Sequence, residues 1–223
     1  MCEDLGLAIY LFQPFRDFDG VSAERLAKNV ERAKRKFELM HELGTDRILV
    51  CSNVSSDTIR DDALIVDQFG TLAGIAKEAG VIVAYEAFTW GRYVNSYKHA
   101  WKLIDAVNHP SLGLALDTFH TLSIRDSVDE IAAIPGDRIA FVQIADAPVL
   151  AMDVLEWSRY YRCFSGRASL MLRASRHACS RRRPAGRCRA PRVVRSPRGR
   201  KYRGRDTADA GSESASAINE PAR

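Results

Sequence analysis

The sequence predicts an α/β fold built on a parallel β-sheet, because short apolar runs alternate with longer stretches of helical period. The runs are rich in Val, Ile, Leu and Ala and show little polar alternation, which is typical of strands buried on both faces. Turn-forming residues bound each run. The five predicted strands cover residues 7–12, 47–51, 81–85, 112–116 and 139–144.

Helical periodicity is clearest in residues 22–43, which follow the first run. Apolar residues recur there at spacings of three and four, so they form one face of a helix. Ser22 is the predicted N-cap and Gly44 the predicted C-cap. The other predicted helices are 61–79, ending at Gly80, then 95–107, and 127–134, closed by Pro135-Gly136; residues 2–6 are interpreted as the last turn of a further helix.

Right-handed crossovers between such units build either an open doubly wound sheet or a (β/α)₈ barrel. No G-x-G-x-x-G motif follows the first strand, which argues against a dinucleotide-binding sheet. A complete barrel needs about 250 residues, whereas this chain has 223. We therefore expect a partial barrel that lacks an upstream βα unit and the last strands.

The composition argues against several classes of protein. Hydrophobic residues make up 46% of the chain, enough for a sizeable core. No apolar run approaches the roughly 20 residues that span a bilayer, and the first residues have no signal-peptide pattern. The five cysteines are scattered without a C-x-x-C pair, which argues against a zinc knuckle or a disulfide framework. These features predict a cytoplasmic protein with no membrane partner.

Three polar residues stand where predicted strands end, namely Glu86, Asp117 and Gln143. Consecutive parallel strands emerge side by side at their carboxyl edge, so these side chains should converge on one point. Two carboxylates and an amide oxygen suit a hard divalent cation such as Mg²⁺ or Mn²⁺, with Co²⁺ as a further candidate. The alternative is that each acidic residue only caps a helix or forms a turn.

Two further residues near these strand ends carry chemistry of their own. His120 lies three residues after Asp117 and would stand at the rim of the same cavity, where it suits proton transfer near neutral pH. A structural histidine in a βα loop is the alternative. Arg16 follows the first strand and could bind a substrate carboxylate by a bidentate fork, or be a solvated loop charge.

The stretch 83–95, Val-Ala-Tyr-Glu-Ala-Phe-Thr-Trp-Gly-Arg-Tyr-Val-Asn, resembles the sugar phosphate isomerase/epimerase family of xylose-isomerase-like TIM barrels. Within that family it looks like the bacterial enzymes that dehydrate 3-dehydroshikimate. The resemblance extends over about residues 1–164 and is specific from 84 onward. The other matching segments are 10–17, 109–113, 116–120, 134–137, 142–148, 152–159 and 162–164.

The resemblance implies a partial TIM barrel in residues 1–162, with a metal held by Glu, Asp, Gln and a final Glu. Glu86, Asp117 and Gln143 match the first three ligands, and no strand here matches the one that carries the fourth. His120 matches an active-site histidine of the family. Ser158 and Arg162 match its substrate-facing segment, so Ser158 joins His120 as a catalytic candidate and Arg162 joins Arg16 as a substrate-binding candidate.

The implied activity is that of a metal-dependent lyase acting on a small molecule. It removes water from 3-dehydroshikimate to give protocatechuate, in the breakdown of quinate and shikimate. We expect a chain that lacks the fourth ligand to be impaired in this reaction. The alternative within the same superfamily is an isomerase or epimerase acting on a sugar phosphate. The oligomeric state is not predicted.

The last part of the chain, residues 163–223, differs sharply in charge from the rest. Residues 1–162 hold 17 Lys/Arg against 24 Asp/Glu, whereas residues 163–223 hold 16 against 4. Between Cys163 and Arg205 there are 14 Arg, one Lys and no acidic residue. One interpretation is a nucleic-acid-binding arm. We favour the other, a frameshifted and disordered Arg-rich tail, because Lys is nearly absent and the change falls inside a family motif.

Overall fold

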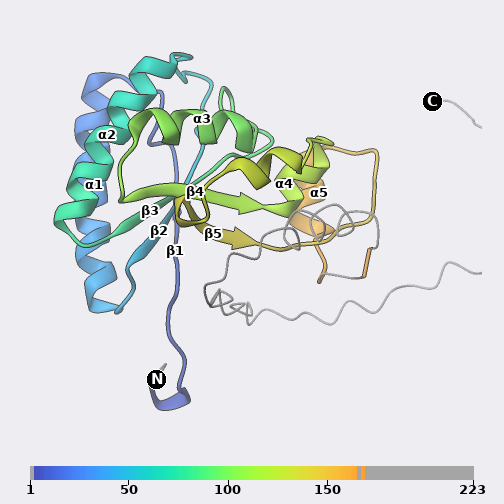
Figure 1. Cartoon of the computed structure of the whole chain (residues 1–223), viewed down its shortest axis with the longest axis horizontal. Helices are drawn as coiled ribbons and strands as arrows, with labels where there is room; N and C mark the ends of the chain where they lie inside the picture. Colours follow the sequence, from blue (N-terminus) through green and yellow to red (C-terminus); the bar gives the residue numbers. More distant parts are fainter. Residues whose placement is uncertain (1–2, 165–166, 169–223) are drawn as a thin grey trace, which may run out of the picture. The chain divides into compact units, whose positions relative to one another are not determined.

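The computed structural model describes residues 3–164 and 167–168, which contain a five-stranded, entirely parallel sheet (Figure 1). The strands lie side by side in chain order. They are β1 (Phe12–Phe15), β2 (Arg47–Cys51), β3 (Ile82–Glu86), β4 (Leu112–Asp117) and β5 (Ile139–Gln143). The predictions for the basic tail fall almost entirely outside the described residues.

The strand order decides between the two architectures that the sequence allows. A doubly wound sheet reverses its strand order and carries helices on both faces, whereas this order is sequential from β1 to β5. Every crossover therefore passes over the same face, which the long helices cover (Figure 1). They are α1 (Ala23–Glu42), α2 (Asp62–Glu78) and α3 (Tyr97–Val107). The prediction of barrel-type βα units is confirmed.

The two faces of the sheet differ in size of side chain. The helix-facing side carries large apolar residues such as Val50, Tyr85 and Leu114, which pack with the helices in the main core. The opposite side carries smaller residues, among them Cys51, Ala84 and Ala115. Because side chains alternate along a strand, every second residue of β3 and β4 lies on this inner face. The small side chains leave room there for polar groups at the strand ends.

Helix boundaries follow the predicted caps. The hydroxyl of Ser22 accepts a hydrogen bond from the backbone N–H of Arg25 (3.4 Å). Gly44 and Gly80 follow α1 and α2 with positive φ angles of 64° and 65°. In α1 the N–H of Thr45 bonds back to the carbonyl of Met40, which closes the helix in a Schellman motif. Local sequence therefore sets where these helices begin and end.

Two predicted elements differ in the structure. The first strand, predicted at 7–12, is observed at Phe12–Phe15, because pairing with β2 selects Phe12 and Phe15 and leaves Leu7 60% exposed. The helix predicted at 127–134 is a 3₁₀ turn, η2 (Asp129–Ala133), and the α-helix of this crossover, α4 (Thr118–Ser123), begins directly after β4. The side chain of Asp117 caps α4. The helix therefore begins directly after β4, earlier in the chain than the stretch whose helical periodicity was used for the prediction.

The remaining short elements lie near the ends of the described chain. η1 (Glu3–Leu5) is a 3₁₀ turn closed by Gly6 at positive φ, in the place predicted for the end of a helix. η3 (Gly136–Arg138) precedes β5, and α5 (Val154–Tyr160), which the periodicity did not predict, follows it. No helix in the described part of the chain is long and apolar enough to span a bilayer.

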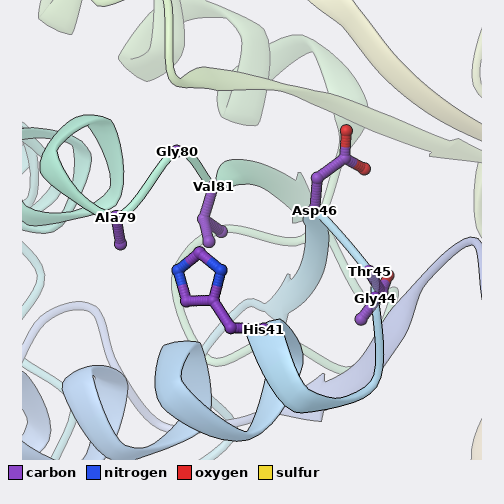
Figure 2. Close-up of a pocket in the computed structure, with 7 residues that line it drawn as sticks. All are labelled: His41, Gly44, Thr45, Asp46, Ala79, Gly80 and Val81. Atoms are coloured by element: carbon purple, nitrogen blue, oxygen red, sulfur yellow. The ribbon is translucent and has the colours of Figure 1, made fainter.

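A cavity of about 290 Å³ lies where the amino ends of β2 and β3 meet the carboxyl ends of α1 and α2 (Figure 2). Its lining residues are His41, Gly44, Thr45, Asp46, Ala79, Gly80 and Val81. All of them directly precede a strand or end a helix. The predicted metal ligands stand at the other ends of the strands, so this cavity is separate from the candidate site.

Candidate metal site at the carboxyl ends of β3, β4 and β5

Glu86, Asp117 and Gln143 are the last residues of three adjacent strands. Asp117 pairs with Gln143 across β4 and β5, and Glu86 pairs with Ala115 across β3 and β4. Glu86 stands two residues after the inner-facing Ala84, as Asp117 does after Ala115. Alternation along each strand therefore places the two carboxylates on the inner face, where the sequence predicted them.

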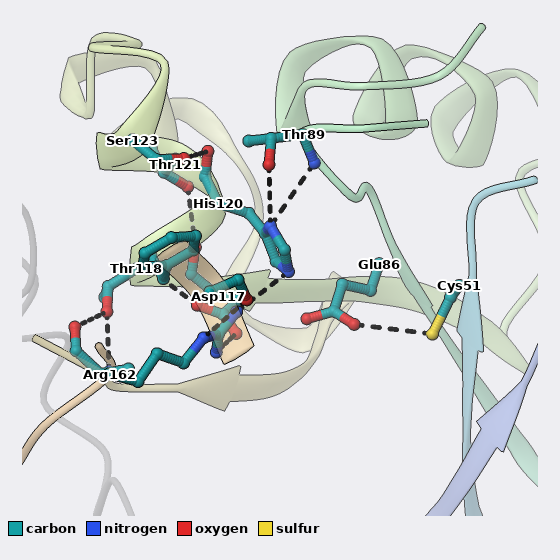
Figure 3. A network of polar contacts seen from close by, with 12 residues as sticks. Cys51, Glu86, Thr89, Asp117, Thr118, His120, Thr121, Ser123 and Arg162 are labelled. Carbon is teal, nitrogen blue, oxygen red and sulfur yellow. Dashed lines mark hydrogen bonds and ion pairs between the residues drawn. The ribbon is translucent and has the colours of Figure 1, made fainter. Parts of the chain in front are cut away.

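His120 completes a tight cluster with the two carboxylates. One ligand atom each of Glu86, Asp117 and His120 lies within 4.8 Å of the others, and all three residues are buried (Figure 3). The sequence placed His120 only at the rim of the cavity. The structure brings it inside, because α4 begins immediately after Asp117 and its first turn carries His120 back over the strand end.

Asp117 serves as a helix cap, the alternative interpretation of this residue, while its second carboxylate oxygen faces the cluster. Its Oδ1 accepts a hydrogen bond from the N–H of Phe119 at 2.7 Å. Its other oxygen, Oδ2, faces the cluster and accepts from Arg162 at 2.6 Å. The cap fixes the rotamer, and the fixed rotamer aims the second oxygen at His120 and Glu86. Capping therefore orients the predicted metal ligand instead of competing with that role.

Glu86 has a strongly perturbed carboxyl group. Its pKa is raised to about 8, chiefly by burial and next by the neighbouring charge of Asp117, while Arg162 and a hydrogen bond from Cys51 oppose the rise. The Cys51 thiol, 3.7 Å from Oε2, has its own pKa raised by burial and remains a donor. A cation between the carboxylates would remove this repulsion. The buried pair therefore fits a divalent metal, and an imidazole beside it adds a nitrogen donor.

His120 is held in its neutral form. Its pKa is lowered to about 4, chiefly by burial, with a further contribution from Arg162 included and the opposing effect of Asp117 overcome. Its Nε2 lies 3.2 Å from a guanidinium nitrogen of Arg162. The backbone N–H of Thr89 points at Nδ1 at 3.4 Å. A guanidinium and a backbone N–H both donate, and a neutral imidazole has one acceptor nitrogen, so only one of these two contacts is a hydrogen bond in a given tautomer. The tautomer that accepts at Nε2 carries its proton on Nδ1, 3.4 Å from the hydroxyl of Thr89.

Aromatic rings enclose His120 on several sides. The ring centroids of Phe88, Trp90 and Phe119 lie 5.0, 4.9 and 5.7 Å from that of the imidazole. Such a shell excludes water and accounts for the burial that depresses the imidazole pKa. Phe88 and Trp90 follow β3, so the segment that carries Glu86 also builds this shell.

Arg162 and Ser158 reach the site from α5. The Nε of Arg162 donates to the hydroxyl of Ser158 at 3.1 Å, and its guanidinium stacks over Phe119 at 4.6 Å. Trp157 anchors the helix by donating from Nε1 to the carbonyl of Pro148 at 2.9 Å. Ser158, predicted to be catalytic, therefore contacts Arg162, while Arg162 contacts two members of the cluster. The roles predicted for both remain predictions.

Arg16 stands on the loop after β1 and is exposed. Its charge lies close enough to the Cys51 thiol to act against the rise in the pKa of that thiol. It is thus at the same edge of the sheet as the cluster, although its substrate-binding role stays a prediction.

A buried carboxyl group beside the site was not predicted. Asp19 is 1% exposed, its Oδ2 accepts from the hydroxyl of Tyr85 at 3.0 Å, and its carbonyl accepts from Asn53 at 2.7 Å. Burial raises its pKa to about 7. Its Oδ1 has no hydrogen-bond partner among the described residues. Nothing in the local sequence marks Asp19, because an Asp in a βα loop is usually exposed.

This buried carboxyl predicts a pH-dependent stability. The folded-state pKa of about 7 lies above the ordinary value of 3.8 for an aspartate. The protonated carboxyl therefore stabilises the fold fully below pH 3.8, and this stabilisation is lost as the pH rises through 7. Replacing Asp19 by Asn should remove this dependence, so the free energy of unfolding of the variant relative to wild type should rise by on the order of 2–3 kcal/mol from pH 5 to pH 8.

Urea denaturation at the two pH values measures that difference. Asp105→Asn, which changes an exposed Asp of α3, is the matched control and should show no such rise. Parallel pH profiles for wild type and Asp19→Asn would show that Asp19 is ionised in the folded protein throughout this range.

Comparison with known proteins shows which family has this fold and which proteins resemble the chain. Residues 1–186 match the family described as xylose isomerase-like TIM barrel. The 3-dehydroshikimate dehydratase of Pseudomonas putida is 56% identical over 170 residues, which cover 76% of this chain and 27% of that protein. The chain therefore spans only about a quarter of the length of this curated relative.

Solved structures agree with the fold. A xylose isomerase-like TIM barrel/4-hydroxyphenylpyruvate dioxygenase fusion protein superposes with a TM-score of 0.75 at 56% identity, covering 76% of this chain and 27% of the other. The IolI protein, solved with a bound zinc atom, has a TM-score of 0.67 at 20% identity over 80% of this chain and 66% of its own; at that identity it supports the fold alone. This chain belongs to the xylose isomerase-like TIM barrel family.

Proposed function

We propose that the chain carries the site of a carbon–oxygen lyase that dehydrates 3-dehydroshikimate to protocatechuate. The observation that carries this proposal is the buried cluster of Glu86, Asp117 and His120, within 4.8 Å of one another. The 56% identity to a 3-dehydroshikimate dehydratase supports the choice of substrate. The cluster alone would also suit a sugar phosphate isomerase, so the choice of the dehydratase rests on the likeness to this relative.

Glu86, Asp117 and Gln143 are the residues that would hold a divalent metal, which leaves Nε2 of His120 free to act as a base. When bound, such an ion supplies a Lewis acid for a ketone oxygen. Mg²⁺, Mn²⁺ and Co²⁺ remain the candidates. Inner-facing Gln143 is adjacent to Asp117 in register and offers an amide oxygen on the same edge.

His120 suits the role of base. In the tautomer protonated at Nδ1, its neutral imidazole would present Nε2 to the site, with the hydroxyl of Thr89 3.4 Å from Nδ1. Nε2 would take the proton from the carbon beside the substrate ketone. The resulting imidazolium would return that proton to the departing β-hydroxyl, which leaves as water, and the imidazole ends neutral. The cyclic dienone that remains then enolises: a ring CH₂ group loses a proton and the ketone oxygen gains one, which makes the ring aromatic and the overall reaction favourable.

Arg162 and the aromatic shell would position the substrate. A guanidinium forms two parallel hydrogen bonds to a carboxylate, and 3-dehydroshikimate carries one carboxylate. Phe88, Trp90 and Phe119 exclude water from the ring, so the proton removed stays near His120. Ser158 would hold the guanidinium in place through Nε.

A dehydratase assay tests the proposal. The protein is mixed with 3-dehydroshikimate, and protocatechuate is followed by its absorbance before and after EDTA, with each divalent metal then added back. Metal-dependent formation of protocatechuate is the expected result. Turnover that is unaffected by EDTA contradicts the metal site. Turnover of sugar phosphates with no protocatechuate would instead support the isomerase alternative.

A further inference from the structure

Glu86 faces a cysteine of the neighbouring strand. Cys51 is the last residue of β2 and pairs in register with Glu86, the last residue of β3. The backbone N–H of Ser52 donates to the carbonyl of Glu86 at 2.9 Å, which continues the ladder one residue beyond β2. The backbones of Cys51 and Glu86 are therefore fixed relative to one another by strand pairing.

Both side chains lie on the inner face of the sheet. Cys51 packs there with Ala84 and Ala115, and Glu86 stands two residues after Ala84 on β3. The Sγ of Cys51 lies 3.7 Å from Oε2 of Glu86, within the reach of a thiol hydrogen bond (Figure 3). An ionised carboxylate only accepts, so the thiol is the donor when Glu86 carries its charge.

The two carboxylates of the site are oriented by different donors. Asp117 is held through Oδ1 by the N–H of Phe119. Glu86 has one more rotatable bond than an aspartate, and Cys51 is the side chain that donates a hydrogen bond to it among the described residues. Its Oε1 accepts no hydrogen bond from those residues. The thiol therefore restrains one oxygen of Glu86 and leaves the other to meet a cation.

The contact between Cys51 and Glu86 is shielded from solvent. Cys51 is 0% exposed and Glu86 is 4% exposed, so bulk water does not compete for the donor or the acceptor. A hydrogen bond in such surroundings is stronger than in water, and removing its donor leaves the carboxylate less well satisfied. Even a weak thiol donor therefore influences where this carboxylate points.

We propose that Cys51 is a positioning residue of the metal site, whose thiol holds Oε2 of Glu86 and so sets the direction in which the carboxylate meets the ion. Cys51 acts through Glu86 and contacts neither metal nor substrate. A carboxylate oxygen has lone pairs for both a thiol and a metal, so the contact persists when an ion binds. This inference rests on the metal site of the proposed function, and it requires no particular substrate.

Metal titration without substrate tests this role. In isothermal titration calorimetry with Mn²⁺, Cys51→Ala should bind the ion about tenfold more weakly than wild type, the lower end of the range for losing a group that orients a metal ligand. Cys51→Val fills the space of the thiol without a donor and should lose as much. Cys51→Ser keeps a donor on a shorter bond, which Glu86 meets after a small shift, and should lose only about threefold.

Val50→Ala is the matched control for loosened packing. Val50 precedes Cys51 on β2, is equally buried and faces the helices. Its replacement should lower the midpoint of thermal unfolding and leave the Mn²⁺ affinity of the folded protein unchanged. Titration with Zn²⁺ is the control for direct ligation, because zinc favours thiolate ligands more than manganese does. Cys51→Ala should weaken the binding of both ions by the same factor.

The outcomes separate this inference from the proposed function. Equal Mn²⁺ affinity in wild type and Cys51→Ala would overturn the positioning role and leave the metal site standing. Full affinity in Cys51→Val would show that the thiol only fills space, and a larger loss for Zn²⁺ than for Mn²⁺ would show that sulfur binds the ion; either result overturns the inference.

The expected order of affinities in a protein that forms no protocatechuate would support the role of Cys51 and contradict the lyase. A wild-type protein that binds no Mn²⁺ contradicts the metal site and this inference together. Circular dichroism checks folding. If Cys51→Val does not fold, the alanine and serine variants still decide, because a serine variant as weak as the alanine variant would overturn the inference.

Discussion

Replacing Asp117 by Asn should weaken divalent-metal binding by at least about a hundredfold and reduce dehydratase turnover by a similar or larger factor. Asparagine keeps an oxygen that can cap α4 through the N–H of Phe119, but it removes the charge that faces Glu86 and His120. The loss should therefore appear in metal affinity, measured by calorimetry with Mn²⁺, with little change in the midpoint of thermal unfolding.

A second capping aspartate provides the control for this substitution. Asp153 caps α5 through the N–H groups of Leu155 and Glu156, is exposed, and lies outside the cluster. Asp153→Asn should bind metal as wild type does. If Asp117→Asn also keeps its affinity, Asp117 is only a helix cap and the metal site loses one of its two carboxylates.

Replacing His120 by Ala should lower turnover of 3-dehydroshikimate by about 10²–10⁴-fold, the range expected for the loss of a general base. The imidazole stays neutral over the usual assay range because burial lowers its pKa to about 4, so the loss should be similar at pH 6 and pH 8. Steady-state measurements of kcat at these two pH values test the expectation.

His41→Ala is the matched control, because His41 is an exposed histidine near the end of α1, at the opposite edge of the sheet. Its turnover should equal that of wild type. Near-normal kcat in His120→Ala would remove His120 from the proton transfer. It would leave the residue as a metal ligand or a packing group in the aromatic shell.

Much of the fold follows from local patterns. Short apolar runs located β2 to β5 within one or two residues, and Ser22, Gly44 and Gly80 marked helix ends, because capping depends on the residue itself and on its nearest neighbours. The position of β1 was wrong because an apolar run does not say which of its residues find a partner strand. Pairing with β2 decided that.

The candidate site was likewise predicted only in part from the sequence. Glu86, Asp117 and Gln143 were recognisable because strand ends of a parallel sheet share one edge. The inward turn of His120 depends on where α4 begins. The contact of Arg162 with Asp117 depends on the path of the chain after β5. The burial of Asp19 depends on the packing of its loop against Tyr85 of β3. None of these has a local signature.

The sequence by itself determined the succession of βα units, the sites of helix capping and the polar residues that end the strands. Each of these depends on a side chain and its close neighbours along the chain. Only the tertiary structure decided the sequential strand order, the enclosure of His120 and the contact of Arg162 with Asp117 and His120. These features depend on which distant segments of the chain pack together. Burial of apolar surface drives that packing, and because it is not directional, the sequence alone does not show which segments will meet.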